Sequence, residues 1–121
     1  MANEISITTG VQVANGNSRR PSNQISKTFD QAAVGIAELT IDVTTSDQSV
    51  TLPLTTPGWI QLRNDGANPI QWGPNNGGAI LVMGEISPGA THQIEVPSAA
   101  TTIRVKTTAS TSSLSLVVIR R

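Results

Sequence analysis

Apolar and polar residues alternate along most of the chain with a period of two, which is typical of half-buried β-strands. The alternating segments are short, and residues that favour turns separate them. The clearest of these segments span residues 5–13, 39–43, 50–54, 60–62, 94–96, 103–105 and 114–118. This spacing predicts an all-β protein, a single antiparallel β-sandwich of the jelly-roll type with about eight to ten short strands. Residues 30–39 lack the apolar stripe of a helix, so we expect a loop there that leads into a strand.

The stretch "GWIQLRNDGANPIQWGP" at 58–74 holds both tryptophans of the chain and reads as two strands joined by a polar loop. Asp65 and Gly66 form a dipeptide that favours a tight turn between paired strands. We therefore expect a β-hairpin, in which Trp59 lies on the strand face opposite to the apolar series. The glycine-rich "GPNNGG" at 73–78 is expected to follow as a surface loop.

We expect one domain overall, with an N-terminal strand and an arm at 1–27 and the sandwich at 28–121. Within the first part, "NGNSRRPSN" at 15–23 is rich in turn-forming residues and is expected to be a loop. Arg19 and Arg20 in this loop either bind an acidic partner or are solvated on a mobile surface.

The composition limits the classes of partner. Residues 1–60 carry three basic and five acidic groups, and residues 61–121 carry five and three, so no basic cluster favours nucleic acid. Cysteine is absent, which excludes disulfides and thiolate metal sites. No apolar run approaches the length of a membrane span, and the N-terminus lacks the pattern of a secretory signal. We expect a protein made in the cytoplasm, with neither nucleic acid nor membrane as a partner.

Few residues suggest chemistry. His92 is the only histidine, and alternation places it on the same strand face as Ile94, with Glu95 on the opposite face. A general base needs an orienting carboxylate and a nucleophile within hydrogen-bond reach, which this pattern does not supply. The acidic residues considered for a hydrolytic pair are Asp30, Glu38, Asp42 and Asp47. Because they are scattered along the chain, we expect no enzymatic activity, no metal site and no cofactor.

Trp59 and Trp72 allow two interpretations. Aromatic rings on a β-sandwich can stack on sugars, and the amides of "PNNGG" beside Trp72 favour a carbohydrate-binding module. In the other interpretation, the two side chains pack in a secondary core or in an interface between subunits.

Two segments, 79–83 and 114–119, are apolar on both faces of the strands that they are expected to form. A strand in a sandwich covers only one of its faces with the core. The residues expected to point outward are Leu81, Met83, Val117 and Ile119. They need a second cover, which a neighbouring copy would supply, so we expect a homo-oligomer.

In the second half of the chain, "PGWIQLRN" leads into a polar turn and "QWGPNNGG" into a loop. An apolar strand, a Pro-Gly turn and two closing strands follow. The stretches concerned are 57–64, 71–78, 79–83, 88–89, 102–107 and 113–119. This order resembles that of small virion proteins of tailed bacteriophages. The resemblance covers residues 28–119 and fits the first 27 residues only loosely.

The resemblance implies a β-sandwich or jelly roll with a structural, non-enzymatic role on the virion. We expect a capsid decoration (cement) protein, a homotrimer that binds the major capsid protein and stabilises the shell. Arg19 and Arg20 would then belong to an arm that orders against acidic capsid surface. A tail, neck or fibre component is the alternative within this class. A carbohydrate-binding module displayed on a virion is the alternative from another class.

Overall fold

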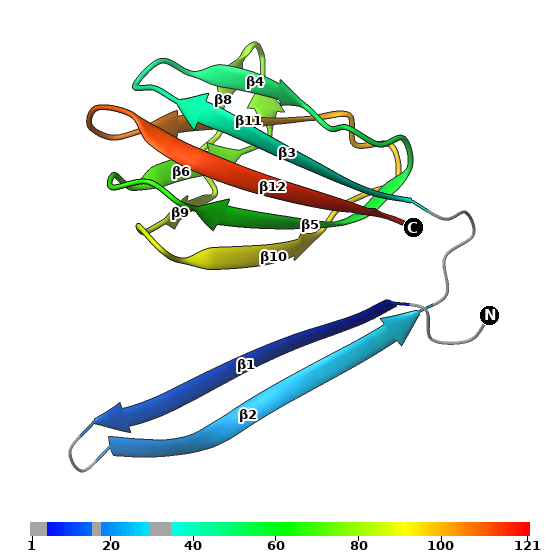
Figure 1. Cartoon of the computed structure of the whole chain (residues 1–121), viewed down its shortest axis with the longest axis vertical. Coiled ribbons are helices and arrows are strands. Elements are labelled where there is room, and N and C mark those ends of the chain that lie inside the picture. Colours follow the sequence, from blue (N-terminus) through cyan, green and yellow to red (C-terminus); the bar gives the residue numbers. More distant parts are fainter. Residues whose placement is uncertain (1–4, 16–17, 30–34) are drawn as a thin grey trace. The chain divides into compact units, whose positions relative to one another are not determined.

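The computed structural model describes residues 5–15, 18–29 and 35–121, with side chains at 6–8 and 35–121. The chain forms two compact units, Met1–Ala32 and Ala33–Arg121. All regular secondary structure in the described ranges is β-strand, as the sequence predicted (Figure 1). Within these ranges, no helix is long and apolar enough to cross a membrane.

The N-terminal unit is a hairpin of two antiparallel strands, β1 (Ile5–Asn15) and β2 (Ser18–Phe29). Its register shifts between Val11 and Val13, where β2 holds one residue more than β1. Such a bulge tolerates a proline within a paired strand, and Pro21 of β2 lies at this point.

The loop predicted at 15–23 is wrong, because most of this stretch belongs to β2. Its turn-forming residues misled the prediction, since the bulge accommodates them within the ladder. Arg19 and Arg20 pair with β1 through their backbone, opposite Ala14 and Val13. Their side chains lie outside the described residues, so their role on an arm stays a prediction.

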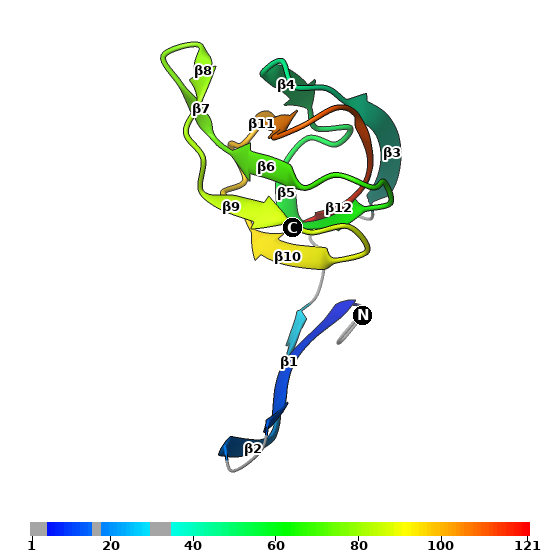
Figure 2. The same cartoon turned by 90° about the vertical axis from the view of Figure 1, so that its left-hand side faces the viewer.

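The C-terminal unit packs two four-stranded antiparallel sheets face to face (Figures 1 and 2). The first sheet has the order β10 (Thr91–Glu95), β5 (Pro57–Asn64), β12 (Ser112–Arg120) and β3 (Ile36–Val43). The second sheet has the order β4 (Gln48–Thr51), β11 (Thr102–Thr107), β6 (Ile70–Gly73) and β9 (Gly84–Ile86). When these eight strands are numbered 1 to 8 along the chain, the first sheet has the order 6-3-8-1 and the second sheet has the order 2-7-4-5. This arrangement is a jelly roll, which confirms the predicted fold.

A small hairpin, β7 (Asn75–Asn76) and β8 (Ala79–Ile80), follows β6. Gly77 and Gly78 form its turn with φ angles of 63° and 88°, in the left-handed region that glycine adopts without strain. The predicted loop is therefore a tight two-residue turn between two very short strands.

The apolar strand predicted at 79–83 is wrong beyond its first two residues. The Leu81 amide donates to the Pro74 carbonyl at 3.0 Å, and the Met83 amide donates to the Trp72 carbonyl at 2.9 Å. These bonds hold the 81–83 segment along the end of β6 without regular strand geometry. Its side chains are exposed and not sandwiched between two apolar layers.

The hairpin predicted at 58–74 is also wrong, because β5 and β6 belong to different sheets. The connection between them crosses from the first sheet to the second. Asp65 and Gly66 do mark a turn, but a local turn signal does not determine which strands pair.

Asn64 organises this crossing from a fully buried position. Its Nδ2 donates to the carbonyls of Asn68 at 2.7 Å and Ile86 at 2.9 Å. Its Oδ1 accepts from the Gly66 amide at 3.0 Å and from the Ser112 hydroxyl at 2.7 Å. One buried amide therefore ties the crossing loop to the β9 and β12 strands and satisfies its own hydrogen-bonding capacity.

The core between the two sheets consists of Val, Leu and Ile side chains that alternate with outward residues along the strands. Its buried members are Val43, Val50, Leu52, Ile60, Leu62, Ile70, Ile86, Ile103, Val105, Leu114, Leu116 and Val118. Most of them belong to the alternating segments that the sequence singled out.

Candidate binding surfaces

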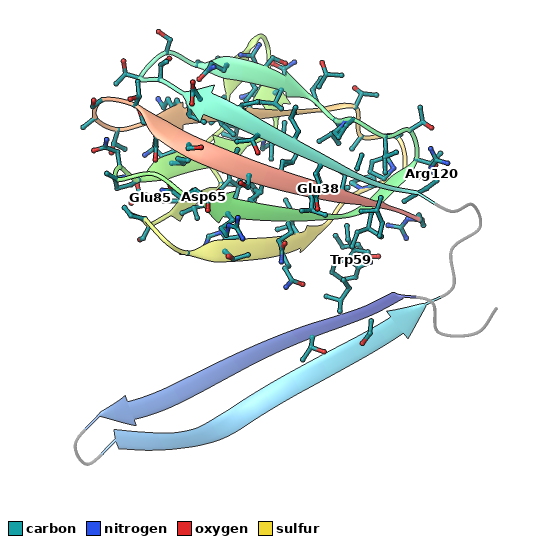
Figure 3. The ribbon with its side chains drawn as sticks, viewed as in Figure 1. Glu38, Trp59, Asp65, Glu85 and Arg120 are labelled. Carbon is teal, nitrogen blue, oxygen red and sulfur yellow. The ribbon has the colours of Figure 1, made fainter. Side chains whose placement is uncertain are left out.

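The outer face of the first sheet carries three rows of side chains that run across β3, β12 and β5. The register of the strands defines these rows, which are Ile36–Ile119–Trp59, Glu38–Val117–Gln61 and Thr40–Ser115–Arg63. The first is called the apolar row here, and the other two are called the polar rows. Figure 3 shows Trp59 and Glu38 projecting from this sheet. The face therefore changes from apolar to polar along the strands.

Val117 and Ile119 point away from the core. They alternate with Leu116 and Val118, which are buried, whereas Val117 and Ile119 are only half-buried. Ile36, which pairs with Ile119 across the sheet, also points outward and is 61% exposed. The sequence did not single out Ile36 because β3 was expected to begin later, after a loop.

The polar rows line a shallow hollow of about 320 Å³ on the outer face. At its edge, the Arg63 Nε donates to the Asp65 Oδ1 at 2.6 Å, and the Ser115 hydroxyl donates to the other carboxylate oxygen. The bond from Ser115 and then the bond from Arg63 lower the pKa of Asp65 below its usual value. Asp65 is therefore held as a carboxylate that orients Arg63 beside the hollow.

Trp72 lies in the second sheet and faces the interior, since its direct partner across the ladder is the buried Val105. Its Nε1 donates to the His92 Nδ1 at 3.3 Å, and the two rings meet edge to face with centroids 6.3 Å apart. His92 therefore lies at the edge of the core on the same strand face as Ile94, and Glu95 points to the other side.

An apolar pocket of about 170 Å³ opens between the two sheets beside this pair. The residues that line it are Leu52, Ile60, Trp72, Gly73, Pro74, Ile94, Val96, Pro97, Ala100, Thr102 and Ile103. The sequence analysis did not detect this pocket, because its walls come from both sheets and from loops far apart in the chain.

A sugar platform shared by the two tryptophans is excluded. Trp59 lies on the outer face of the first sheet, while Trp72 points inward from the second sheet. The sequence analysis missed this separation, because it placed both tryptophans on one hairpin, whereas β5 and β6 belong to different sheets.

The 81–83 segment is the second exposed apolar feature of the sandwich. Leu81, Val82 and Met83 are 47%, 44% and 65% exposed. The sequence predicted exposure of Leu81 and Met83 on the outer side of a strand, but Val82 is exposed with them because the segment is irregular.

Asp47 and Arg104 hold the β7–β8 hairpin next to this segment. The Asp47 carboxylate accepts from the Ile80 amide at 2.7 Å and from the Arg104 guanidinium at 2.9 Å. Arg104 also donates to the Asn75 side chain at 2.9 Å. Desolvation raises the pKa of Asp47, but the bonds from Arg104 and Ile80 and the charges of Arg104 and Lys106 outweigh it, so its pKa is lowered.

We expect acid to destabilise the sandwich through these two carboxylates. The pKa values of Asp47 and Asp65 are lowered in the folded state. Their contribution to the free energy of unfolding is therefore present above the unfolded pKa of 3.8, and it is lost as the pH falls through the folded-state pKa values. The Asp47→Asn/Asp65→Asn variant should therefore lose less of its Tm than the wild type between about pH 5 and pH 2. Glu85→Gln, at the exposed residue of β9, is the control. An unchanged pH dependence of Tm in the double variant would contradict this assignment.

The described residues contain no group of three or more histidine, cysteine or acidic side chains placed to hold a metal ion. Of the acidic residues considered for catalysis, Glu38 and Asp42 lie on the exposed side of β3, and Asp47 pairs with Arg104. Asp30 lies outside the described residues.

No family model matches the chain, and no curated protein sequence matches it. Among solved structures, the chain is similar to the Yersinia pseudotuberculosis-derived mitogen, with 14% identity, coverage of 74% of this chain and 88% of that chain, and a TM-score of 0.44. It is also similar to a chain of the Bacillus endospore appendages that form disulfide-linked pili, with 12% identity, coverage of 76% and 93%, and a TM-score of 0.43. At these values neither neighbour carries an argument about function.

Proposed function

We propose that this protein is a capsid decoration (cement) protein of a tailed bacteriophage, a homotrimer that binds the major capsid protein and stabilises the shell. The observation that carries the proposal is the apolar row on the outer face of the first sheet. Apolar side chains gathered on one face and flanked by polar ones are typical of protein-binding surfaces. We assign this face to the contact with the capsid.

The two polar rows beside the apolar row support the same role. Glu38, Gln61 and Arg63 lie on one side of the apolar row and offer groups that form hydrogen bonds at the rim of an interface. A protein that binds only the assembled shell stabilises it by mass action, and many copies multiply a modest energy per site.

We assign the N-terminal hairpin the role of an arm that contacts a partner. Its strands are 11 and 12 residues long, and no third strand joins this sheet among the described residues. A two-stranded hairpin is at best marginally stable in water. Contact with a capsid subunit would stabilise it, and Arg19 and Arg20 fit an acidic patch on such a subunit.

Particles that lack this protein provide the test. After mixing and sedimentation, we expect the protein to bind in many copies over the shell and to raise the temperature at which the shell opens. Labelled protein found only at the tail or neck would overturn the capsid assignment. Glycan binding that Trp59→Ala abolishes, without any binding to particles, would favour the carbohydrate-binding alternative.

We expect the sandwich to fold without the hairpin but to bind particles more weakly. A chain of residues 33–121 retains every strand of both sheets. It should therefore unfold cooperatively and show the far-ultraviolet circular dichroism of a β-protein. Weaker sedimentation with particles, relative to the full chain, would support the arm. Equal binding by the two chains would show that the hairpin makes no capsid contact.

A further inference from the structure

One edge of the sandwich carries an apolar pocket and an exposed apolar segment next to each other. The pocket lies between the sheets, with Ile60 and Ile94 on one side and Trp72 and Ile103 on the other. The 81–83 segment is hydrogen-bonded to the strand end that forms one wall of this pocket. The two features are therefore parts of one surface.

The pocket is suited to an apolar side chain. Almost all of its exposed lining is apolar, and at about 170 Å³ it is slightly larger than an engineered apolar cavity that stays dry and binds benzene. The atoms around an unfilled apolar space lose contacts on one side. An inserted apolar group restores these contacts without leaving a polar group unsatisfied.

The segment cannot fill the pocket of its own chain in this arrangement. None of Leu81, Val82 and Met83 belongs to the lining of the pocket, and all three side chains are exposed. Their backbone is fixed by the bonds to Pro74 and Trp72. Each copy of the chain therefore presents an exposed apolar segment and, beside it, an apolar pocket that this segment does not line.

The segment is also held in place before any association. A Cβ at Gly73 would lie 1.8 Å from the Leu81 carbonyl oxygen, so only glycine permits this close approach. On the other side, Asp47 accepts from the Ile80 amide directly before the segment. Little backbone freedom is left to lose on binding, which favours association.

We infer that the 81–83 segment of one copy inserts into the Trp72 pocket of the next copy. The occupant is a second copy because both halves of the contact are present on every chain. Such a head-to-tail contact closes into a ring when the rotation between copies permits it. The inference rests on the proposed homotrimer and names the contact that forms it, whereas the capsid contact uses the outer face of the first sheet.

Light scattering on the full chain after size-exclusion chromatography tests the contact. The wild type should elute as a closed oligomer, and Met83→Lys should weaken self-association by about 100-fold or more while the fold is retained. Ile36→Lys is the matched control, since it places the same charge at an equally exposed apolar residue on the other surface. It should keep the oligomer and lose binding to particles.

Mixing two variants gives a sharper readout. Met83→Lys keeps the pocket intact but puts a charge on the 81–83 segment. Thr102→Phe fills the pocket and leaves the 81–83 segment intact. Each alone should be a monomer, and their mixture should form a one-to-one dimer through one intact contact. In a Trp59→Phe background, Trp72 is the only tryptophan, and its fluorescence should change when the dimer forms.

A wild type that stays monomeric at high concentration would overturn the inference, as would an oligomer that survives Met83→Lys. An oligomer that forms as described but does not bind particles would overturn the proposed function and leave the contact between copies intact. The two failures are therefore distinguishable.

Discussion

Replacing Asn64 by alanine should lower the free energy of unfolding of the sandwich by about 3 kcal/mol. The substitution removes the donors to the half-buried carbonyl of Asn68 and the buried carbonyl of Ile86, and it removes the acceptor of the Gly66 amide and the Ser112 hydroxyl. A buried polar group left unsatisfied costs about 1–3 kcal/mol, and part of this cost is relieved when water enters. The crossing between the two sheets depends on this one side chain.

Urea denaturation followed by circular dichroism measures this loss, and the slope of the transition should stay the same. Asn76→Ala is the control because Asn76 is an exposed asparagine of β7, and its effect should stay within about 0.5 kcal/mol. Asn64→Asp keeps the shape of the side chain but turns the two donors into acceptors, so it should also be strongly destabilising. An effect of Asn64→Ala no larger than that of Asn76→Ala would show that the hydrogen bonds are not needed for the crossing.

Ile119→Lys should abolish most binding to capsids while the sandwich stays folded. Ile119 lies at the centre of the apolar row, opposite Ile36 on one side and Trp59 on the other. Burying a whole isoleucine side chain contributes about 1.5–3 kcal/mol, and Ile119 is already half-buried before it binds. Loss of the other half weakens binding by about 4-fold to 13-fold before the cost of burying a charge is added. Val117→Asp, one position along the same strand face, should have the same direction of effect.

Thr108→Lys provides the control for this prediction, because it adds the same charge at an exposed residue of the loop between β11 and β12, outside the three rows. It should bind particles nearly as the wild type does. Thermal unfolding of all three variants checks that the fold is retained. If Ile119→Lys or Val117→Asp dissociates the oligomer in solution, the outer face is a contact between copies. The assignment of the Trp72 pocket to that contact is then wrong.

The alternation of apolar residues was sufficient to predict the fold class and the outward direction of Val117 and Ile119. Period two is a local property that follows from the geometry of an extended chain, so it can be read from one segment at a time. The pairing of strands is not local. The wrong hairpin at 58–74 and the missed pocket have the same cause, since nothing near Trp59 or Trp72 in the chain indicates that their strands lie in different sheets.

Other errors came from composition. The turn-forming residues at 15–23 predicted a loop, but pairing with β1 and a bulge override this local preference. Asn64 looked like part of a polar turn, because the two bonds that tie it to other strands join residues 22 and 48 positions away in sequence. The 81–83 segment was recognised as an apolar surface, but the irregular backbone that exposes Val82 was not.

The central place of β12 in the first sheet has a consequence for the synthesis of this protein. β12 pairs with β5 on one side and with β3 on the other, and β3 pairs with no other strand of its sheet. While the ribosome is still translating β12, β3 has already been made but lacks its pairing partner. Contacts between such distant segments make folding slow. The first sheet is therefore completed only after translation of β12, and until then the apolar face and the unpaired edge of β3 are prone to aggregation.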